Sequence, residues 1–137
     1  MSNLIDVVKE LGIESSSFYT GTSTRDKWDS FDWQVTLSYK GRNIKTDFHC
    51  GMAHANRTWF CGKESVKPIP PSTADVLYSL CVDANSGELS FEEFCSEFGY
   101  NNDSIKDKNI WQQCLETYPK LRRFLGDDFD MVVQAEH

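Results

Sequence analysis

Hydrophobic and polar residues alternate most regularly between residues 33 and 50 of the chain. Successive side chains of a strand point to opposite faces, so this alternation predicts an antiparallel hairpin of two half-buried strands. Lys40 and Gly41 separate the strands and can form a tight turn, because glycine accepts a positive φ. In the first strand, Trp33, Val35, Leu37 and Tyr39 are expected on one face, and the returning strand is expected to contain Ile44, Thr46, Phe48 and Cys50.

Elsewhere apolar residues recur every three or four positions, which is typical of amphipathic helices. Residues 4–11 predict an N-terminal helix that ends at Gly12, and three more helices are expected in the C-terminal half. The last of these should begin after a polar cap at residues 102–104. Pro119 lies inside its apolar pattern, and a kink or break is expected there because proline lacks a backbone donor and clashes with the preceding turn.

Three segments show no such periodicity. Residues 13–32 are polar, with only a short strand indicated at residues 18–20, and residues 51–71 hold three of the four prolines and should be irregular. Residues 127–137 are predicted to be a flexible acidic tail. The order of helix, small sheet and three helices indicates an α+β fold, formed as one domain over residues 1–126.

The charge of the chain narrows the range of partners. The 137 residues are 39% hydrophobic and carry a formal net charge of −7, from 21 acids and 14 bases. A general nucleic-acid binder needs a basic surface, and so does a protein that binds anionic membranes, so neither nucleic-acid nor membrane binding is expected. No apolar run approaches the roughly 18 residues of a membrane span.

The thiols and the first residues indicate a cytosolic protein. The five cysteines are an odd number, widely scattered along the chain, which is typical of reduced thiols. The opening residues "MSNLIDVVKELG" mix acids and a lysine with apolar residues, and this favours an amphipathic helix over a secretion signal.

The string "CVDANSGELSFEEFC", residues 81–95, resembles a calcium loop without meeting its requirements. A twelve-residue EF-hand loop needs an oxygen ligand at its first position and glycine at its sixth. Counting from Asp83 puts Glu88 at the sixth position, and placing Gly87 there puts Val82 at the first. A turn followed by a capping box of Ser90 and Glu93 explains the same residues, so no calcium binding is expected.

Two other groups of residues carry candidate chemistry. His49, Cys50, His54 and Cys61 lie within thirteen residues and could in principle hold zinc or activate a thiol, although they lack paired ligand spacing. Structural thiols and a surface histidine are the simpler interpretation, so no metal site is predicted. The chain also contains no Gly-rich phosphate loop, no GxSxG and no HExxH, and no cofactor or catalytic residue is assigned.

The segment "RDKWDSFDW", residues 25–33, places aromatic residues among acids. Such a composition is common at protein interfaces, where a few aromatic side chains carry most of the binding energy. The alternative is that the segment folds back and its rings fill the open end of the core. The residues predicted to contact a partner are Trp28, Asp29, Phe31 and Asp32.

Five segments resemble a family of small proteins encoded by tailed bacteriophages and prophages, and together they cover nearly the whole chain. They are "TGTSTRDKWDSFDWQVTLSYKG", "TDFHCGMAH", "ADVLYSLCVDA", "SFEEFCSEFGYNNDSIKDKNIWQQC" and "KLRRFLGDD".

The resemblance implies a phage accessory protein that acts in the host cytoplasm. Many such proteins block a host enzyme or defence complex stoichiometrically. We therefore expect a non-enzymatic protein that binds and inhibits a host protein. The expected target is a nucleic-acid-handling enzyme, either a CRISPR effector, in which case the protein is an anti-CRISPR, or a restriction nuclease. The alternatives are a small zinc-binding or thiol enzyme and a self-associating phage regulatory protein.

Overall fold

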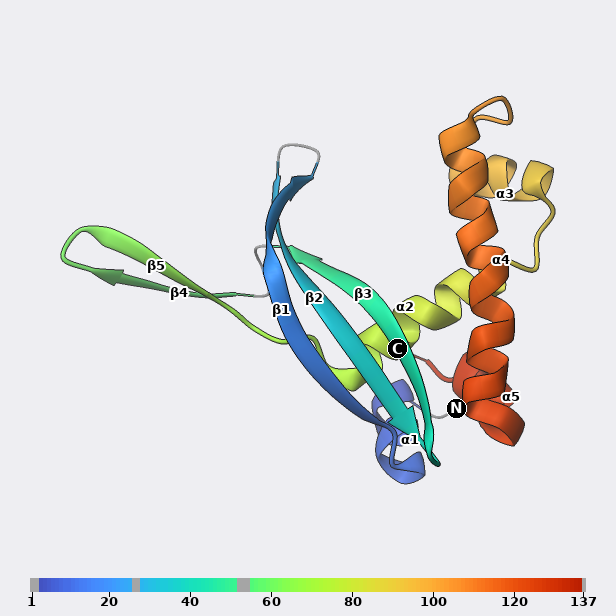
Figure 1. Cartoon of the computed structure of the whole chain (residues 1–137), viewed down its shortest axis with the longest axis horizontal. Coiled ribbons are helices and arrows are strands. Elements are labelled where there is room, and N and C mark those ends of the chain that lie inside the picture. Colours follow the sequence, from blue (N-terminus) through green and yellow to red (C-terminus); the bar gives the residue numbers. More distant parts are fainter. Residues whose placement is uncertain (1–2, 26–27, 52–54, 137) are drawn as a thin grey trace. The chain divides into compact units, whose positions relative to one another are not determined.

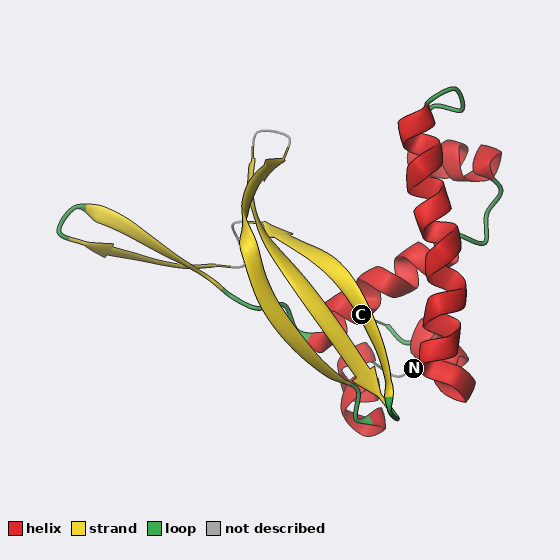
Figure 2. Ribbon diagram, in the orientation of Figure 1, coloured by secondary structure: helices red, strands yellow, loops and turns green. Residues whose placement is uncertain are grey.

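A computed structural model describes residues 3–25, 28–51 and 55–136, and it has the predicted α+β fold, with an N-terminal helix, an antiparallel sheet and a helical C-terminal half (Figures 1 and 2). Its elements in chain order are α1 (Leu4–Leu11), β1 (Glu14–Arg25), β2 (Trp28–Tyr39), β3 (Arg42–Gly51), β4 (Ala55–Phe60), β5 (Lys63–Pro68), α2 (Thr73–Ser86), α3 (Phe91–Phe98), α4 (Ile105–Leu125), the 3-10 turn η2 (Gly126–Asp128) and α5 (Phe129–Gln134).

The chain divides into two compact units. The sheet unit comprises residues 13–76, and the helical unit comprises residues 1–12 and 77–137. Helix α2 begins in the sheet unit and continues into the helical unit. Compact units can be parts of one folding domain, so the prediction of a single domain over residues 1–126 stays a prediction.

The sheet unit contains the predicted hairpin as strands β2 and β3, with β1 pairing on the other side of β2. All four apolar residues expected on one face of β2 are buried. Lys40 and Gly41 form the turn, both with positive φ, of 49° and 76°. This two-residue turn with left-handed backbone matches the twist of the flanking strands.

The polar segment before the hairpin contains far more strand than the short one indicated at residues 18–20, because residues 14–25 form β1 and residues 28–32 begin β2. Strand β1 pairs with β2 from Glu14 to Arg25, with one irregularity between Tyr19 and Gly21. An edge strand is held by backbone hydrogen bonds to its neighbour, and threonine suits a pleated surface, so a strand can form there without a continuous apolar pattern.

Residues 51–71 contain a second hairpin, which corrects the prediction that they are irregular. Strands β4 and β5 form a separate two-stranded sheet. Cys61 and Gly62 make its turn with φ values of 51° and 76°. The prolines of this segment lie at the end of the hairpin and beyond it. Proline has no backbone N–H group to donate, and at these positions no inner strand depends on such a donor for pairing.

The helices begin and end where polar caps and glycines predict. The Asn3 side chain accepts a hydrogen bond from Ile5 N at 2.8 Å, and the Ser72 hydroxyl accepts one from Asp75 N at 3.1 Å. Of the polar residues 102–104 that were predicted to cap α4, Ser104 is the one that does so. These bonds satisfy backbone donors that the first turn of a helix leaves unpaired.

Helix α4 continues through Pro119 to Leu125, so of the kink or break expected there the break is absent. Proline removes one backbone hydrogen bond from the helix interior. Leu121, Phe124 and Leu125 follow the proline and are all buried. Their packing favours the continuous helix and offsets the lost bond.

The expected flexible tail is instead a folded part of the helical unit. Phe129 and Val132, spaced i and i+3 in α5, are buried, and this burial orders the segment. Beyond α5, Glu136 forms a parallel bridge with Asn3, and its carbonyl accepts a hydrogen bond from Leu4 N. The acidic composition of the last residues concealed this short amphipathic helix.

Candidate functional site

The residues predicted to contact a partner lie in a strand rather than a loop. Phe31 is only 4% exposed, which corresponds to the alternative in which the ring fills the core. Trp28 and Asp29 pair through their backbones with Arg25 and Thr24, and their side chains lie outside the described part of the structure. Phe31 and Trp33 are two residues apart and both buried, so the alternation of β2 extends further back than the sequence pattern indicated.

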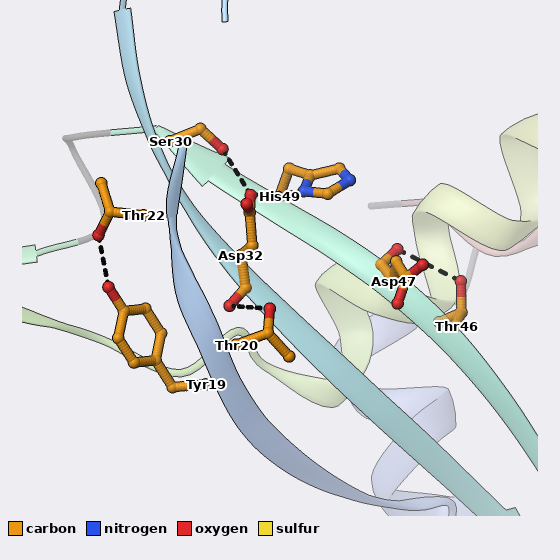
Figure 3. A network of polar contacts seen from close by, with 8 residues as sticks. All are labelled: Tyr19, Thr20, Thr22, Ser30, Asp32, Thr46, Asp47 and His49. Atoms are coloured by element: carbon orange, nitrogen blue, oxygen red, sulfur yellow. Dashed lines mark hydrogen bonds and ion pairs between the residues drawn. The ribbon is translucent and has the colours of Figure 1, made fainter. Parts of the chain in front are cut away.

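Asp32 belongs to a polar network on the sheet (Figure 3). It lies directly opposite His49 in the β2–β3 register, and its Oδ1 is 2.6 Å from His49 Nδ1. The Ser30 hydroxyl donates to the same oxygen at 3.0 Å, and the Thr20 hydroxyl donates to the Asp32 carbonyl at 3.0 Å. Ser30 and His49 both bind the Asp32 carboxylate, which is not the arrangement of a serine–histidine nucleophile pair. Its evident effect is to join three strands.

The cysteines and histidines of the alternative enzyme hypothesis are not brought together where they are described. His49 is exposed and Cys50 is buried, as expected for neighbours on a strand, and Cys61 lies in the β4–β5 turn. His54 lies outside the described residues. Among the residues that are described, no three His, Cys, Asp or Glu side chains are close enough to hold a metal ion. A zinc site that includes His54 stays untested.

The buried thiols are held in their protonated form. Burial raises the pKa of Cys81 to about 12, and burial together with the Asp83 carboxylate raises the pKa of Cys114 to about 11. Burial, with the Asp75 carboxylate nearby, also raises the pKa of Cys50. The thiolate is the nucleophilic form, so none of these three thiols is activated near neutral pH.

The calcium-like string forms the junction of two helices. Asp83 to Ser86 are the last residues of α2 rather than a turn, and only residues 87–90 connect α2 to α3. The predicted capping box is confirmed, with the Ser90 hydroxyl accepting from Glu93 N at 3.2 Å and Ser90 N donating to Glu93 Oε1 at 3.4 Å. A twelve-residue loop that surrounds a cation is therefore not the structure of this segment.

An open groove of about 770 Å³ lies in the helical unit between α2 and α3. Its apolar surface includes Phe98, which is 47% exposed, and its acidic surface comes from three exposed glutamates of α3. We call it the α2–α3 groove. It is lined by Val82, Asn85, Ser86, Leu89, Glu92, Glu93, Ser96, Glu97 and Phe98.

Helix α4 holds the connection between the two helices in place. Trp111 Nε1 donates a hydrogen bond to the Leu89 carbonyl at 2.9 Å, and the Trp111 ring lies 5.4 Å from that of Phe91. A Cβ atom on Gly87 would lie 2.9 Å from Leu115 N and closer still to the Cys114 carbonyl, so glycine permits this close approach of the backbones. The connection between the two helices that line the groove is thus anchored on α4.

The acidity of the protein is concentrated in the helical unit. That unit contains 14 acids and six bases, a net charge of −8, whereas the sheet unit contains seven acids and eight bases, a net charge of +1. The two values add to the −7 of the whole chain. Counting charges separately for the two halves of the sequence could have directed attention to the helices instead of to residues 25–33.

The partial burial of Asp83, an acid of the helical unit, gives a pH-dependent prediction. Burial raises the pKa of the Asp83 carboxyl above the roughly 3.9 of an unfolded aspartate. The folded state then binds the proton more tightly, so the contribution of Asp83 to stability should fall as pH rises from the unfolded pKa through the raised folded pKa. Asp83 also lies in the last turn of α2, where a negative charge is unfavourable.

The Asp83→Asn variant should therefore be more stable than the parent at neutral pH, by about 0.3–1 kcal/mol from the helix-end term alone. The difference should shrink as the pH approaches 4, because the parent carboxyl becomes protonated. Urea unfolding across this pH range measures it, with the exposed Asp103→Asn as the control. An equal or larger gain at low pH would contradict the assignment.

Comparisons with known proteins find no match for this chain among protein-family models, curated proteins or solved structures. Among the described residues, no helix has both the length and the apolar character needed to cross a membrane.

Proposed function

We propose that this protein is a non-enzymatic inhibitor that binds a basic surface of a host protein through the α2–α3 groove. The observation that supports this is the combination of an exposed apolar surface, from Val82 and Phe98, with the exposed carboxylates of Glu92, Glu93 and Glu97. The phage origin, the host cytoplasm as the place of action and a defence system as the target come from the resemblance to phage proteins.

The chemistry of the groove favours a partner that handles nucleic acids. Such an enzyme binds phosphates with lysine and arginine side chains, and it carries the same basic surface when nucleic acid is absent. The glutamates would attract that surface and speed association, while Phe98 would supply apolar contact area. Binding of this kind needs no catalytic residue, metal or cofactor.

The experiment titrates the purified protein into DNA-cleavage reactions of a CRISPR effector and of a restriction endonuclease, in the absence of added zinc or calcium. Stoichiometric inhibition of at least one of them is expected, and it should weaken as salt rises because salt screens charge attraction. The Glu92→Lys, Glu97→Lys double variant should lose most of the inhibition.

The matched control is the Glu10→Lys, Glu116→Lys double variant, which changes the net charge equally at two exposed positions of the helical unit outside the groove. It should retain most of the inhibition. Equal losses in the two double variants would show that net charge matters and the groove does not. If the protein neither binds nor inhibits these enzymes, the proposed class of target is wrong.

A further inference from the structure

The β4–β5 hairpin forms a two-stranded sheet of its own within the sheet unit. In the described part of the chain, its two strands pair only with each other, from Ala55 opposite Pro68 to Phe60 opposite Lys63 (Figure 1). A single two-stranded hairpin is marginally stable in water, because it cannot bury enough apolar surface. Packing against another surface would stabilise it.

Among the aromatic side chains of the sheet unit whose exposure the structure describes, the two most exposed lie at the tip of this hairpin. Trp59 is 72% exposed and Phe60 is 80% exposed, next to the Cys61-Gly62 turn. Lys63 and Lys67 of β5 are exposed as well. Residues 55–68 contain three bases and one acid, a net charge of +2 in a chain whose total is −7. The hairpin thus combines apolar rings with positive charge.

The α2–α3 groove has the complementary chemistry. It combines exposed apolar side chains with Glu92, Glu93 and Glu97, and a volume of about 770 Å³ is within the range of sites that enclose bulky ligand groups. We propose that the β4–β5 hairpin of one copy of this protein binds in the α2–α3 groove of a second copy. Trp59 and Phe60 contact the apolar surface, and Lys63 and Lys67 face the glutamates.

The area available sets the strength of this association. Two aromatic side chains bury on the order of 150–250 Å² each, which is well below the roughly 800 Å² per partner of a standard stable interface. Self-association is therefore weak and depends on concentration. It occupies the groove to which we assign host-protein binding, so a host partner would compete with it, but the association itself does not depend on that function.

Sedimentation velocity from micromolar to millimolar concentration tests the proposal. The wild-type protein should form dimers or larger species as concentration rises, and the rate of Cys61 alkylation should fall in parallel. Cys61 is a suitable reporter because the other four thiols are buried. The Trp59→Ala, Phe60→Ala variant should remain monomeric, whereas Phe18→Ala, which removes an equally exposed ring from the sheet, should behave as wild type.

Exchanging the charges of the hairpin and the groove tests whether these two surfaces contact each other. Lys63→Glu, Lys67→Glu and Glu92→Lys, Glu97→Lys should each weaken association several-fold, and the chain that carries all four changes should recover it. Recovery in the combined variant would show that these charges interact, because losses at independent sites add. This readout needs no host protein. The groove variant alone should also lose inhibition, so failure of either proposal can be seen separately.

Three results would overturn the inference. The first is a wild-type protein that stays monomeric at every concentration. The second is an association that neither the hairpin nor the groove variant changes. The third is binding of a labelled DNA duplex that disappears in the Trp59→Ala, Phe60→Ala variant while self-association is unaffected. The aromatic rings and basic side chains of the hairpin would then serve to bind nucleic acid.

Discussion

Replacing Phe94 with alanine should destabilise the protein by about 3–5 kcal/mol, because the change leaves a cavity as large as an aromatic ring. Phe94 is 2% exposed and lies on the buried face of α3. Its ring is 5.1 Å from that of Phe98 and stacks on Tyr100 at 5.2 Å. The variant therefore loses both apolar burial and two ring contacts.

Equilibrium unfolding in urea measures this loss, and Phe98→Ala is the matched control. Phe98 lies one turn further along the same helix but is half exposed, so its removal should cost clearly less. Circular dichroism of the native state shows whether the Phe94 variant is still folded before denaturant is added. Equal losses for the two variants would mean that the buried face of α3 is wrongly assigned.

The Gly87→Ala variant should lose about 3 kcal/mol, at the upper end of the usual cost of overpacking. The atoms that a Cβ would meet belong to the backbone of Cys114 and Leu115 in α4, and a backbone cannot move aside as a flexible side chain can. Helices α2 and α4 would have to separate. The same displacement would disturb the Trp111–Leu89 hydrogen bond beside the α2–α3 groove.

A comparison with Gly12 separates crowding from backbone conformation. Gly12 has a φ of 73°, and nothing lies within 4 Å of the place where a Cβ would be. Asparagine tolerates the left-handed region, so Gly12→Asn should cost little, whereas Gly87→Asn should be at least as damaging as Gly87→Ala. Thermal unfolding of the variants would decide. A harmless Gly87→Asn would show that α4 does not approach this closely.

The parts of the fold that the sequence predicted are those in which a single element carries its own signal. Strand β2 alternates over residues 33–39, and Ser90 with Glu93 marks the beginning of α3. Strands β1, β4 and β5 gave no comparable signal. These strands are held by backbone pairing with a neighbouring strand. The side chains of a polar strand do not reveal that its backbone will pair in this way. Helix α5 was missed because its two buried residues lie among acids.

The candidate site was harder to predict because it is formed by two helices together. The pattern "FEEFCSEF" shows glutamates between apolar residues, but only the arrangement of α2 against α3 leaves Phe98 and the glutamates around one groove. Residues 25–33 showed a similar mixture of aromatic and acidic residues. Residues 28–33 of this segment belong to β2, which places Phe31 in the core, since strand alternation decides which rings are buried.

The bridge between Asn3 and Glu136 makes the chain a suitable subject for circular permutation. This isolated bridge brings the two ends of the described chain together, so a short flexible linker can join them without crossing the molecule. New termini can then be opened at the exposed residues 101–103 between α3 and α4. In such a permutant, α1 and α5 are consecutive in sequence, so their packing no longer requires the two most distant parts of the chain to meet during folding.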